Sequence, residues 1–265
     1  MFSCQDSNSE DLPVGRLRIL VAEDNPINQM VVAGVLRKAG HTVSLARDGI
    51  EAVSLVARHE FDAVIMDVQM PEMDGLQATA QIRANEQGTE RHLPIIAVTA
   101  DATRADRQRC RAAGMDGYLT KPIVAELLFE ALAAALEPSP GIAPLPRTDP
   151  KIPQAADSGR PTRPGAADLK YQQELARMFL EDCSPSLSPI RAAIDHRDAA
   201  ALKMAAHTLK GSVAVFQDAA AFDAAFRMEC IGRDADWNQA ETAWTSLLAE
   251  TDRLCRSLRS AVAGL

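Results

Sequence analysis

The sequence has few aromatic residues and no excess of positive charge. Aromatic side chains make up 4% of the 265 residues, whereas hydrophobic residues make up 47%. The formal net charge is -8 at pH 7, so the chain lacks the basic balance of a module that neutralises many nucleic-acid phosphates. We therefore expect no nucleic-acid partner.

The sequence also lacks a long apolar run. A membrane span takes about 20 apolar residues, and the stretch 127–136 is both short and interrupted by Glu130. Residues 1–15 are acidic and have no apolar core of the kind found in signal peptides, so we expect an N-terminal linker there. We therefore predict no direct membrane insertion and a cytoplasmic location.

The cysteines have no pattern that predicts a zinc site or a disulfide framework. They are few and lie far apart, at Cys4, Cys110, Cys183, Cys230 and Cys255. Their odd number and wide spacing favour reduced structural thiols.

Residues 16–137 alternate short apolar runs with segments of helical period, which predicts a doubly wound, five-stranded parallel α/β sheet. The expected strands are 17–22, 42–46, 61–67, 94–100 and 117–120. The expected helices are 27–39, 49–58, 75–86, 102–112 and 124–136. The first, third and fourth strands are almost wholly apolar, so we place them centrally and the other two at the edges.

A linker and a helical domain follow. Residues 138–165 contain eight of the chain's 15 prolines, a composition that stops helices and strand ladders, so we expect a semi-extended linker there. Residues 166–265 show apolar positions at intervals of three and four, which predicts an all-α four-helix bundle with central helices near 198–215 and 219–231. We expect Pro185 and Pro189 to interrupt or start helices.

Three carboxylates are expected to meet at one edge of the sheet. Glu23 and Asp24 follow the first strand, and Asp67 ends the third. The carboxyl ends of parallel strands form the ligand crevice, where packed carboxylates favour a hard divalent cation such as Mg²⁺. Thr99 and Lys121 end the fourth and fifth strands and add a hydroxyl and an ammonium. Together these groups predict a phosphoryl site.

The motifs at these strand ends resemble those of the receiver domain of response regulators and hybrid sensor kinases. They are VAEDNPINQ (21–29), MDVQMPEMDG (66–75), VTA (98–100) and YLTKP (118–122). The resemblance implies a flavodoxin-like fold and a phosphoryl group accepted on Asp67. It implies that Lys121 and Thr99 contact the phosphoryl oxygens, and that Thr99 and Tyr118 form the conformational switch.

The same resemblance implies a magnesium site. Asp24, Asp67 and the backbone carbonyl of Gln69 would bind Mg²⁺, and Glu23 would act mainly through a bound water. Asp74 and Gly75 are expected to begin a helix.

A second candidate residue, His207, lies in the segment AAHTLKGSVAVF (205–216). Helical spacing places it on one face with Lys203, Lys210 and Gly211. We expect an exposed imidazole flanked by amines, which suits a nucleophile that meets a phosphorylated carboxylate. Glycine is unfavourable inside a helix, and its use at Gly211 suggests that a partner approaches there.

The string from His207 to Ser212 resembles the signature of histidine phosphotransfer (HPt) domains. This resemblance implies that His207 is a phosphoacceptor through Nε2, that Lys210 assists the approach of phosphate, and that Gly211 and Lys203 belong to the docking face. Many members have glycine at the position of Gln217, so the turn between the two central helices is expected to differ here.

The favoured interpretation is a two-component phosphorelay protein, either part of a hybrid sensor histidine kinase or a partner of one. A sensor kinase would phosphorylate Asp67, and His207 would exchange the group with receiver domains. The sequence has no P-loop, so no autokinase activity is expected. A non-catalytic receiver module that regulates a kinase is the alternative. A dehalogenase-like phosphatase is disfavoured, because Gln69 stands where its second aspartate would be needed.

Overall fold

The computed structural model describes residues 15–89, 91–99, 103–137 and 166–263. The expected linker 138–165, Cys4 and most of the expected N-terminal segment 1–15 lie outside these ranges. Within the described residues, no helix is long and apolar enough to cross a membrane.

The first part of the chain is a parallel sheet of five strands in the order β2-β1-β3-β4-β5. The strands are β1 (Arg18–Ala22), β2 (Thr42–Ala46), β3 (Ala63–Asp67), β4 (Ile95–Thr99) and β5 (Gly117–Thr120). All four pairings are parallel. The doubly wound fold, the central strands and the edge strands are therefore confirmed.

Helices cover both faces of the sheet. They are α1 (Pro26–Lys38), α2 (Gly49–Arg58), α3 (Gly75–Glu86), α4 (Arg104–Ala113) and α5 (Ala125–Leu136). Apolar side chains of α1 and α5 pack on one face, and those of α2, α3 and α4 pack on the other.

Two helix starts fix the loops at the carboxyl edge of the sheet. The side chain of Asn25 accepts hydrogen bonds from the N–H groups of Ile27 and Asn28, so α1 begins directly after the acidic pair. Asp74 forms a capping box with Gln77 at the start of α3, which confirms that Asp74 and Gly75 begin a helix. A Cβ on Gly75 would lie 2.0 Å from the carbonyl oxygen of Asp67, so glycine allows this loop to close on β3.

The second part is a bundle of long helices. They are α6 (Ala166–His196), α7 (Ala199–Ala214), α8 (Ala219–Asp234) and α9 (Ala240–Ala263), with a short 3-10 turn η1 (Trp237–Gln239). Asp198 and Asp218 cap α7 and α8, and the bundle core includes Phe179, Leu209 and Leu247. The predicted bundle is confirmed.

The expected interruption at the prolines is wrong. Pro185 and Pro189 both lie inside α6, which runs unbroken to His196. Both are exposed, so the carbonyl groups that they leave without a helical partner can be hydrated.

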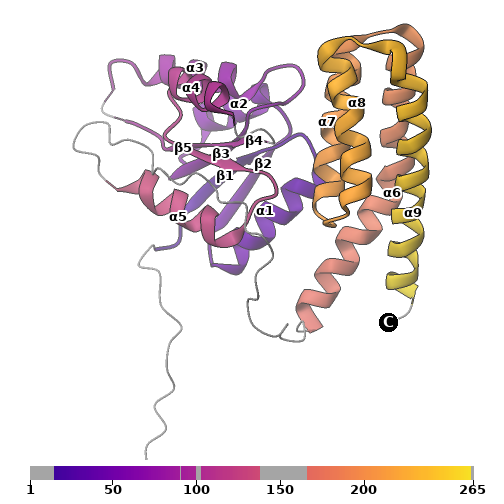
Figure 1. The fold of residues 1–265 in the computed structure, drawn as a ribbon. Helices are drawn as coiled ribbons and strands as arrows, with labels where there is room; N and C mark the ends of the chain where they lie inside the picture. The colour runs from indigo at the N-terminus through magenta and orange to yellow at the C-terminus, as the bar shows by residue number, and fades with distance from the viewer. Residues whose placement is uncertain (1–14, 90, 100–102, 138–165, 264–265) are drawn as a thin grey trace, which may run out of the picture.

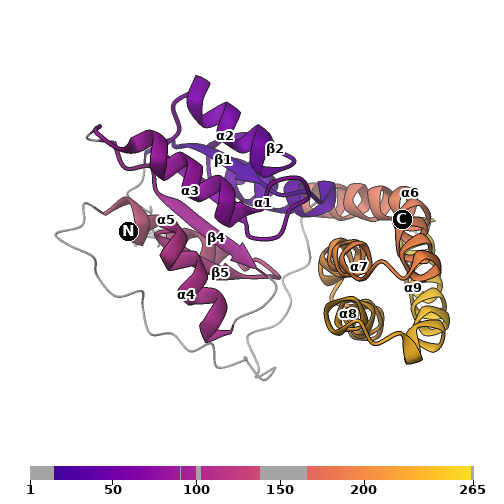
Figure 2. The same cartoon turned by 90° about the horizontal axis from the view of Figure 1, so that it is seen from above.

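Helix α1 lies between the sheet and the bundle, as Figures 1 and 2 show, and it contacts α6 and α7. Val32 and Leu36 face the sheet. Ile27 is 1% exposed and belongs to the bundle's apolar cluster, against which Met30 and Val31 also pack. One helix thus joins the two apolar cores.

The turn at Gln217 provides a test of local strain. Gln217 has φ 54°, a left-handed conformation that suits glycine and costs other residues about 1–2 kcal/mol. Gln217→Gly should therefore raise the free energy of unfolding of the bundle by about 1 kcal/mol. Denaturant unfolding followed by circular dichroism measures the change. The control, Gln217→Ala, keeps the Cβ and should give no such gain; equal gains would contradict the strain argument.

Candidate functional site

The three predicted carboxylates converge at the carboxyl edge of the sheet. Each of Glu23, Asp24 and Asp67 offers an oxygen within 4.8 Å of those of the other two. Glu23 is 3% exposed and Asp67 is 1% exposed. The strands place them there because β1 and β3 are parallel neighbours in the sheet.

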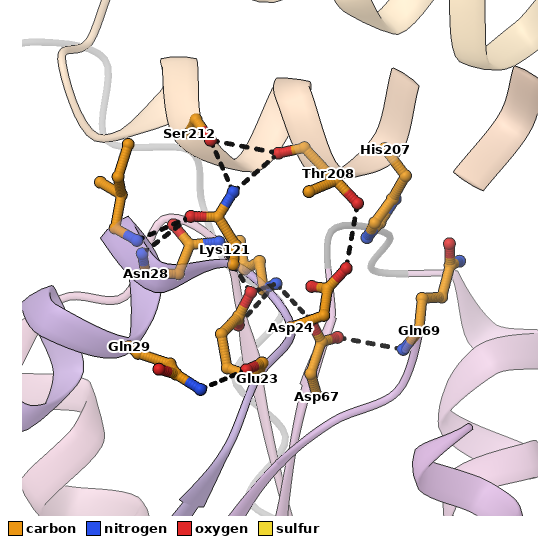
Figure 3. Close-up of polar contacts among 12 residues, drawn as sticks. Glu23, Asp24, Asn28, Gln29, Asp67, Gln69, Lys121, His207, Thr208 and Ser212 are labelled. Atoms are coloured by element: carbon orange, nitrogen blue, oxygen red, sulfur yellow. Dashed lines mark hydrogen bonds and ion pairs between the residues drawn. The ribbon is translucent and has the colours of Figure 1, made fainter. Parts of the chain in front are cut away.

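Lys121 neutralises part of this charge. Its Nζ lies 2.6 Å from Oδ2 of Asp67 and 2.8 Å from Oε2 of Glu23. Asn28 donates a further hydrogen bond to Glu23 at 2.9 Å, and the Gln69 N–H donates to Oδ1 of Asp67 at 3.0 Å. Figure 3 shows these groups gathered below α7.

The balance of charge in the pocket is negative. Burial, followed by repulsion from Glu23, raises the pKa of Asp67 well above its usual range, although Lys121 opposes the shift. Burial and Glu23 raise the pKa of Asp24 in the same way. Burial alone would lower the pKa of Lys121, but Glu23 and Asp67 outweigh it and raise that pKa. Three carboxylates and one ammonium leave a negative charge that a bound cation would neutralise. Carboxylate oxygens are ligands that fit Mg²⁺.

The residues expected to form the switch lie on the neighbouring strands. Thr99 ends β4 and is buried, and Tyr118 lies on β5 and is half-buried. The guanidinium of Arg107 lies 5.2 Å from the centre of the Tyr118 ring. Burial raises the pKa of Tyr118.

His207 is buried, contrary to the exposed imidazole that the sequence suggested. It is 3% exposed, and Lys210 is 2% exposed. Nδ1 of His207 lies 2.8 Å from Oε1 of Glu229, whose other oxygen lies 2.5 Å from Nζ of Lys210. Burial alone would raise the pKa of Glu229, but His207 and Lys210 outweigh it and lower that pKa.

The hydrogen bond to Glu229 determines which ring nitrogen of His207 is available. An ionised carboxylate only accepts hydrogen bonds, so Nδ1 carries the proton when the imidazole is neutral. Nε2 then keeps its lone pair. In Figure 3 the imidazole points from α7 toward the carboxylates, and His207 and Lys121 line the same small cavity of about 20 Å³.

Polar contacts join the rim of the carboxylate pocket to α7. The Thr208 hydroxyl donates to Asp24 at 3.0 Å. Nδ2 of Asn25 donates to Oγ of Ser212 at 2.5 Å and to the Thr208 carbonyl at 3.1 Å. A Cβ on Gly211 would lie 2.8 Å from Nδ2 of Asn28, so glycine permits the approach of α1.

The sequence did not identify every residue of the site, and one residue expected at the docking face, Lys203, does not line the cavity beside His207. Lys203 is partly exposed, and its backbone packs against Gly232 of α8. Glu229 was missed, although an acid one helical turn after the apolar Ala225 signals a buried partner. Asn25 and Asn28 stand inside the motif that carries the receiver resemblance, but nothing in the sequence pairs them with α7.

Two family models match separate parts of the chain. A family model described as a response regulator receiver domain matches residues 19–133. A second, described as an Hpt domain, matches residues 174–260.

Histidine kinases are among the curated relatives. Histidine kinase 3 of Arabidopsis thaliana is 42% identical over 142 residues, which are 46% of this chain and 14% of that protein. Hybrid signal transduction histidine kinase I of Dictyostelium discoideum is 40% identical, over 43% of this chain and 7% of that protein. The chain thus spans a small part of the length of these relatives.

Solved structures also match parts of the chain. The receiver domain of a Pseudomonas aeruginosa sensor histidine kinase, with a magnesium ion in its active site cleft, is 43% identical, with a TM-score of 0.42 over 46% of this chain and 98% of that chain. A Saccharomyces cerevisiae co-crystal of a histidine phosphotransfer protein with its downstream receiver matches at 32% identity and a TM-score of 0.42, over 44% of this chain and 87% of that chain.

The contact between His207 and Glu229 can be tested by NMR of the imidazole nitrogens. In the wild type, the ¹⁵N chemical shifts should place the proton of the neutral ring on Nδ1. Glu229→Gln introduces an amide that can donate or accept, so it should raise the fraction protonated on Nε2. Glu250→Gln, which removes a partly exposed carboxylate of α9 that pairs with Arg253, is the control and should leave His207 unchanged. A wild-type ring protonated on Nε2 would contradict the geometry.

The negative balance of the pocket predicts that Mg²⁺ stabilises the fold. At a free concentration of a hundred times Kd, a cation that binds only the folded state adds about 2.7 kcal/mol. Mg²⁺ should therefore raise the thermal midpoint of the wild type, and Asp24→Asn should lose most of that rise. Glu130→Gln removes an exposed carboxylate and should keep it. Equal Mg²⁺ responses in all three proteins would place the cation elsewhere.

Proposed function

We propose a phosphorelay function for this chain, which belongs to the response regulator receiver domain and Hpt domain families of two-component signalling. Asp67 accepts a phosphoryl group, and His207 of the same chain exchanges that group with it. We assign residues 16–137 to the receiver domain, 166–265 to the HPt domain and 138–165 to the linker between them.

The observation that supports this proposal best is the position of His207 over the carboxylate pocket. His207 and Lys121 line one cavity, and Lys121 lies 2.6 Å from Asp67. A nucleophilic nitrogen, an acceptor carboxylate and a neutralising ammonium thus meet at one point. A binding module would have no chemical need for this arrangement.

The first step transfers a phosphoryl group to Asp67. An Asp67 carboxylate oxygen attacks the phosphorus of a phosphohistidine on a sensor histidine kinase. The P–N bond breaks, the donor imidazole leaves with the bond's electron pair and takes up a proton, and Asp67 becomes an acyl phosphate. Asp67 is 1% exposed, so the bundle must leave α1 before an external kinase reaches it.

The second step transfers the group to His207. Nε2 attacks the phosphorus, the P–O bond to Asp67 breaks, and the carboxylate is restored. Glu229 accepts the Nδ1–H hydrogen bond and stabilises the positive charge that develops on the imidazole. Lys121 contacts the oxygens of the phosphoryl group in both steps, because it lies between Asp67 and the cavity. Lys210, held by Glu229, adds positive charge beside His207.

The pocket residues fit a magnesium ion. Asp24, Asp67 and the Gln69 carbonyl would hold it, and Glu23 would act through a bound water. When bound, the cation neutralises charge on the phosphoryl oxygens. Thr208 donates to Asp24, so α7 also orients one of the proposed ligands.

Thr99 and Tyr118 form the proposed switch. Thr99 hydrogen-bonds the phosphoryl group, and Tyr118 turns inward beside it. Arg107, which lies over the Tyr118 ring, links this motion to α4.

The proposed partners are a sensor histidine kinase that supplies the phosphoryl group and a receiver domain of another response regulator that takes it from His207. We place these reactions in the cytoplasm. The free thiols of Cys110, Cys183, Cys230 and Cys255 support that location, because thiols stay reduced there.

Phosphoryl transfer in three versions of the 265-residue chain tests the proposal. An acyl phosphate and Mg²⁺ are added to the wild type, Asp67→Asn and His207→Gln, and phosphohistidine and phosphoaspartate are measured separately. The wild type should gain both labels, Asp67→Asn should lose both, and His207→Gln should keep only phosphoaspartate. If neither residue is labelled by the acyl phosphate or by any kinase while the fold stays intact, the relay fails and the binding module becomes the better account.

A further inference from the structure

A second contact between the receiver and the bundle lies outside the carboxylate pocket. Tyr171 comes from the N-terminal part of α6, and its hydroxyl donates to the backbone carbonyl of Met30 in α1 at 2.8 Å. Tyr171 and Met30 are partly buried and pack against the bundle's apolar cluster. None of the residues proposed for phosphoryl chemistry takes part in this contact.

Gly34 makes this contact possible. It lies inside α1, one turn after Met30, where glycine is less favourable than alanine for helix formation. A Cβ at this position would lie 2.5 Å from Oη of Tyr171 and 2.8 Å from Cζ, closer than carbon atoms approach oxygen or carbon without bonding. Any other residue would force the tyrosine to move.

The direction of helical side chains explains the pairing. A side chain in an α-helix points toward the N-terminus and covers the preceding turn. A side chain at position 34 would therefore cover the carbonyl of residue 30. Glycine leaves that carbonyl open to a donor from outside the helix, and the Tyr171 hydroxyl donates a hydrogen bond to it.

We propose that Tyr171 and Gly34 form a recognition point that selects which receiver the bundle accepts, and that the selected partner is a receiver with glycine at this position of α1. This inference rests on the proposed pairing of Asp67 with His207. It assigns to α6 a specificity role distinct from the chemistry on α7. A receiver with a larger residue at this position keeps its carboxylate pocket but loses the contact with α6.

The inference is tested first by hydrogen exchange in the unphosphorylated 265-residue chain. Exchange is followed in segments 26–38 and 170–180 of the wild type, Gly34→Ala and Tyr171→Phe. Gly34→Ala should speed exchange in both segments by roughly five- to tenfold, the effect of losing a hydrogen bond and a close contact. Tyr171→Phe, which removes only the hydroxyl, should give a smaller increase. Lys170→Ala, an exposed neighbour on α6, is the control and should give none.

A double variant separates recognition from general destabilisation. Once Tyr171→Ala has removed the ring, adding Gly34→Ala should not speed hydrogen exchange any further. It should instead slow exchange in 26–38, because alanine favours the helix. An additional loss of protection in the double variant would overturn the proposal. So would unchanged exchange in both Gly34→Ala and Tyr171→Phe.

Transfer kinetics link the contact to the relay. In Gly34→Ala, labelling of Asp67 by an acyl phosphate should be as fast as in the wild type or faster, and transfer to His207 should be roughly five- to tenfold slower. Unchanged transfer in Gly34→Ala would overturn the specificity role. If His207 is not labelled even in the wild type, the proposed function fails, while the exchange pattern still decides whether Tyr171 and Gly34 recognise each other.

Discussion

Helix α1 packs on the sheet with one side and on the bundle with another, and the geometry of the site depends on this double contact. Val32 and Leu36 belong to the core between α1, α5 and the sheet, whereas Ile27 belongs to the core of the bundle. A rigid helix shared by two close-packed cores transmits the position of one domain to the other. The loop before α1 carries Glu23 and Asp24, so the docking of α1 also places the acidic pair beneath α7.

The charges on the two sides of the interface are complementary. The receiver contributes three carboxylates that Lys121 only partly neutralises, and the bundle contributes His207 and Lys210 around Glu229. Buried charges are costly unless they are paired, and the ion pairs of Lys121 and of Glu229 each lie within one domain, whereas Asp24 accepts a hydrogen bond from Thr208 across the interface. Each domain can therefore keep these ion pairs when the two separate, as an exchange between partners requires.

Much of the fold and the pocket could be predicted from the sequence, because the signals are local. Apolar runs marked the strands. Asp67 and Thr99 end their strands and Lys121 directly follows β5, so the parallel sheet brings the three residues together. The long α6 was missed because a proline inside a helix usually kinks or ends it, and the sequence does not show that Pro185 and Pro189 lie on the exposed side of a helix that packs against α7 and α9. The burial of His207 and the pairing of Tyr171 with Gly34 depend on contacts between distant segments, which periodicity does not report. Ile27, Met30 and Val31 carry one signal of this kind that our predictions from the sequence did not use, since a helix that is apolar on a second side needs a second partner.

The central claim is that the receiver and the bundle of one chain form the reacting pair. The most direct test is the rate of transfer from phosphorylated Asp67 to His207 in the wild type, measured over a wide range of protein concentration. Transfer within one chain is first order, so its rate constant should not change with concentration. A rate constant that rises in proportion to protein concentration would show that the two groups meet only between chains, and would contradict this account.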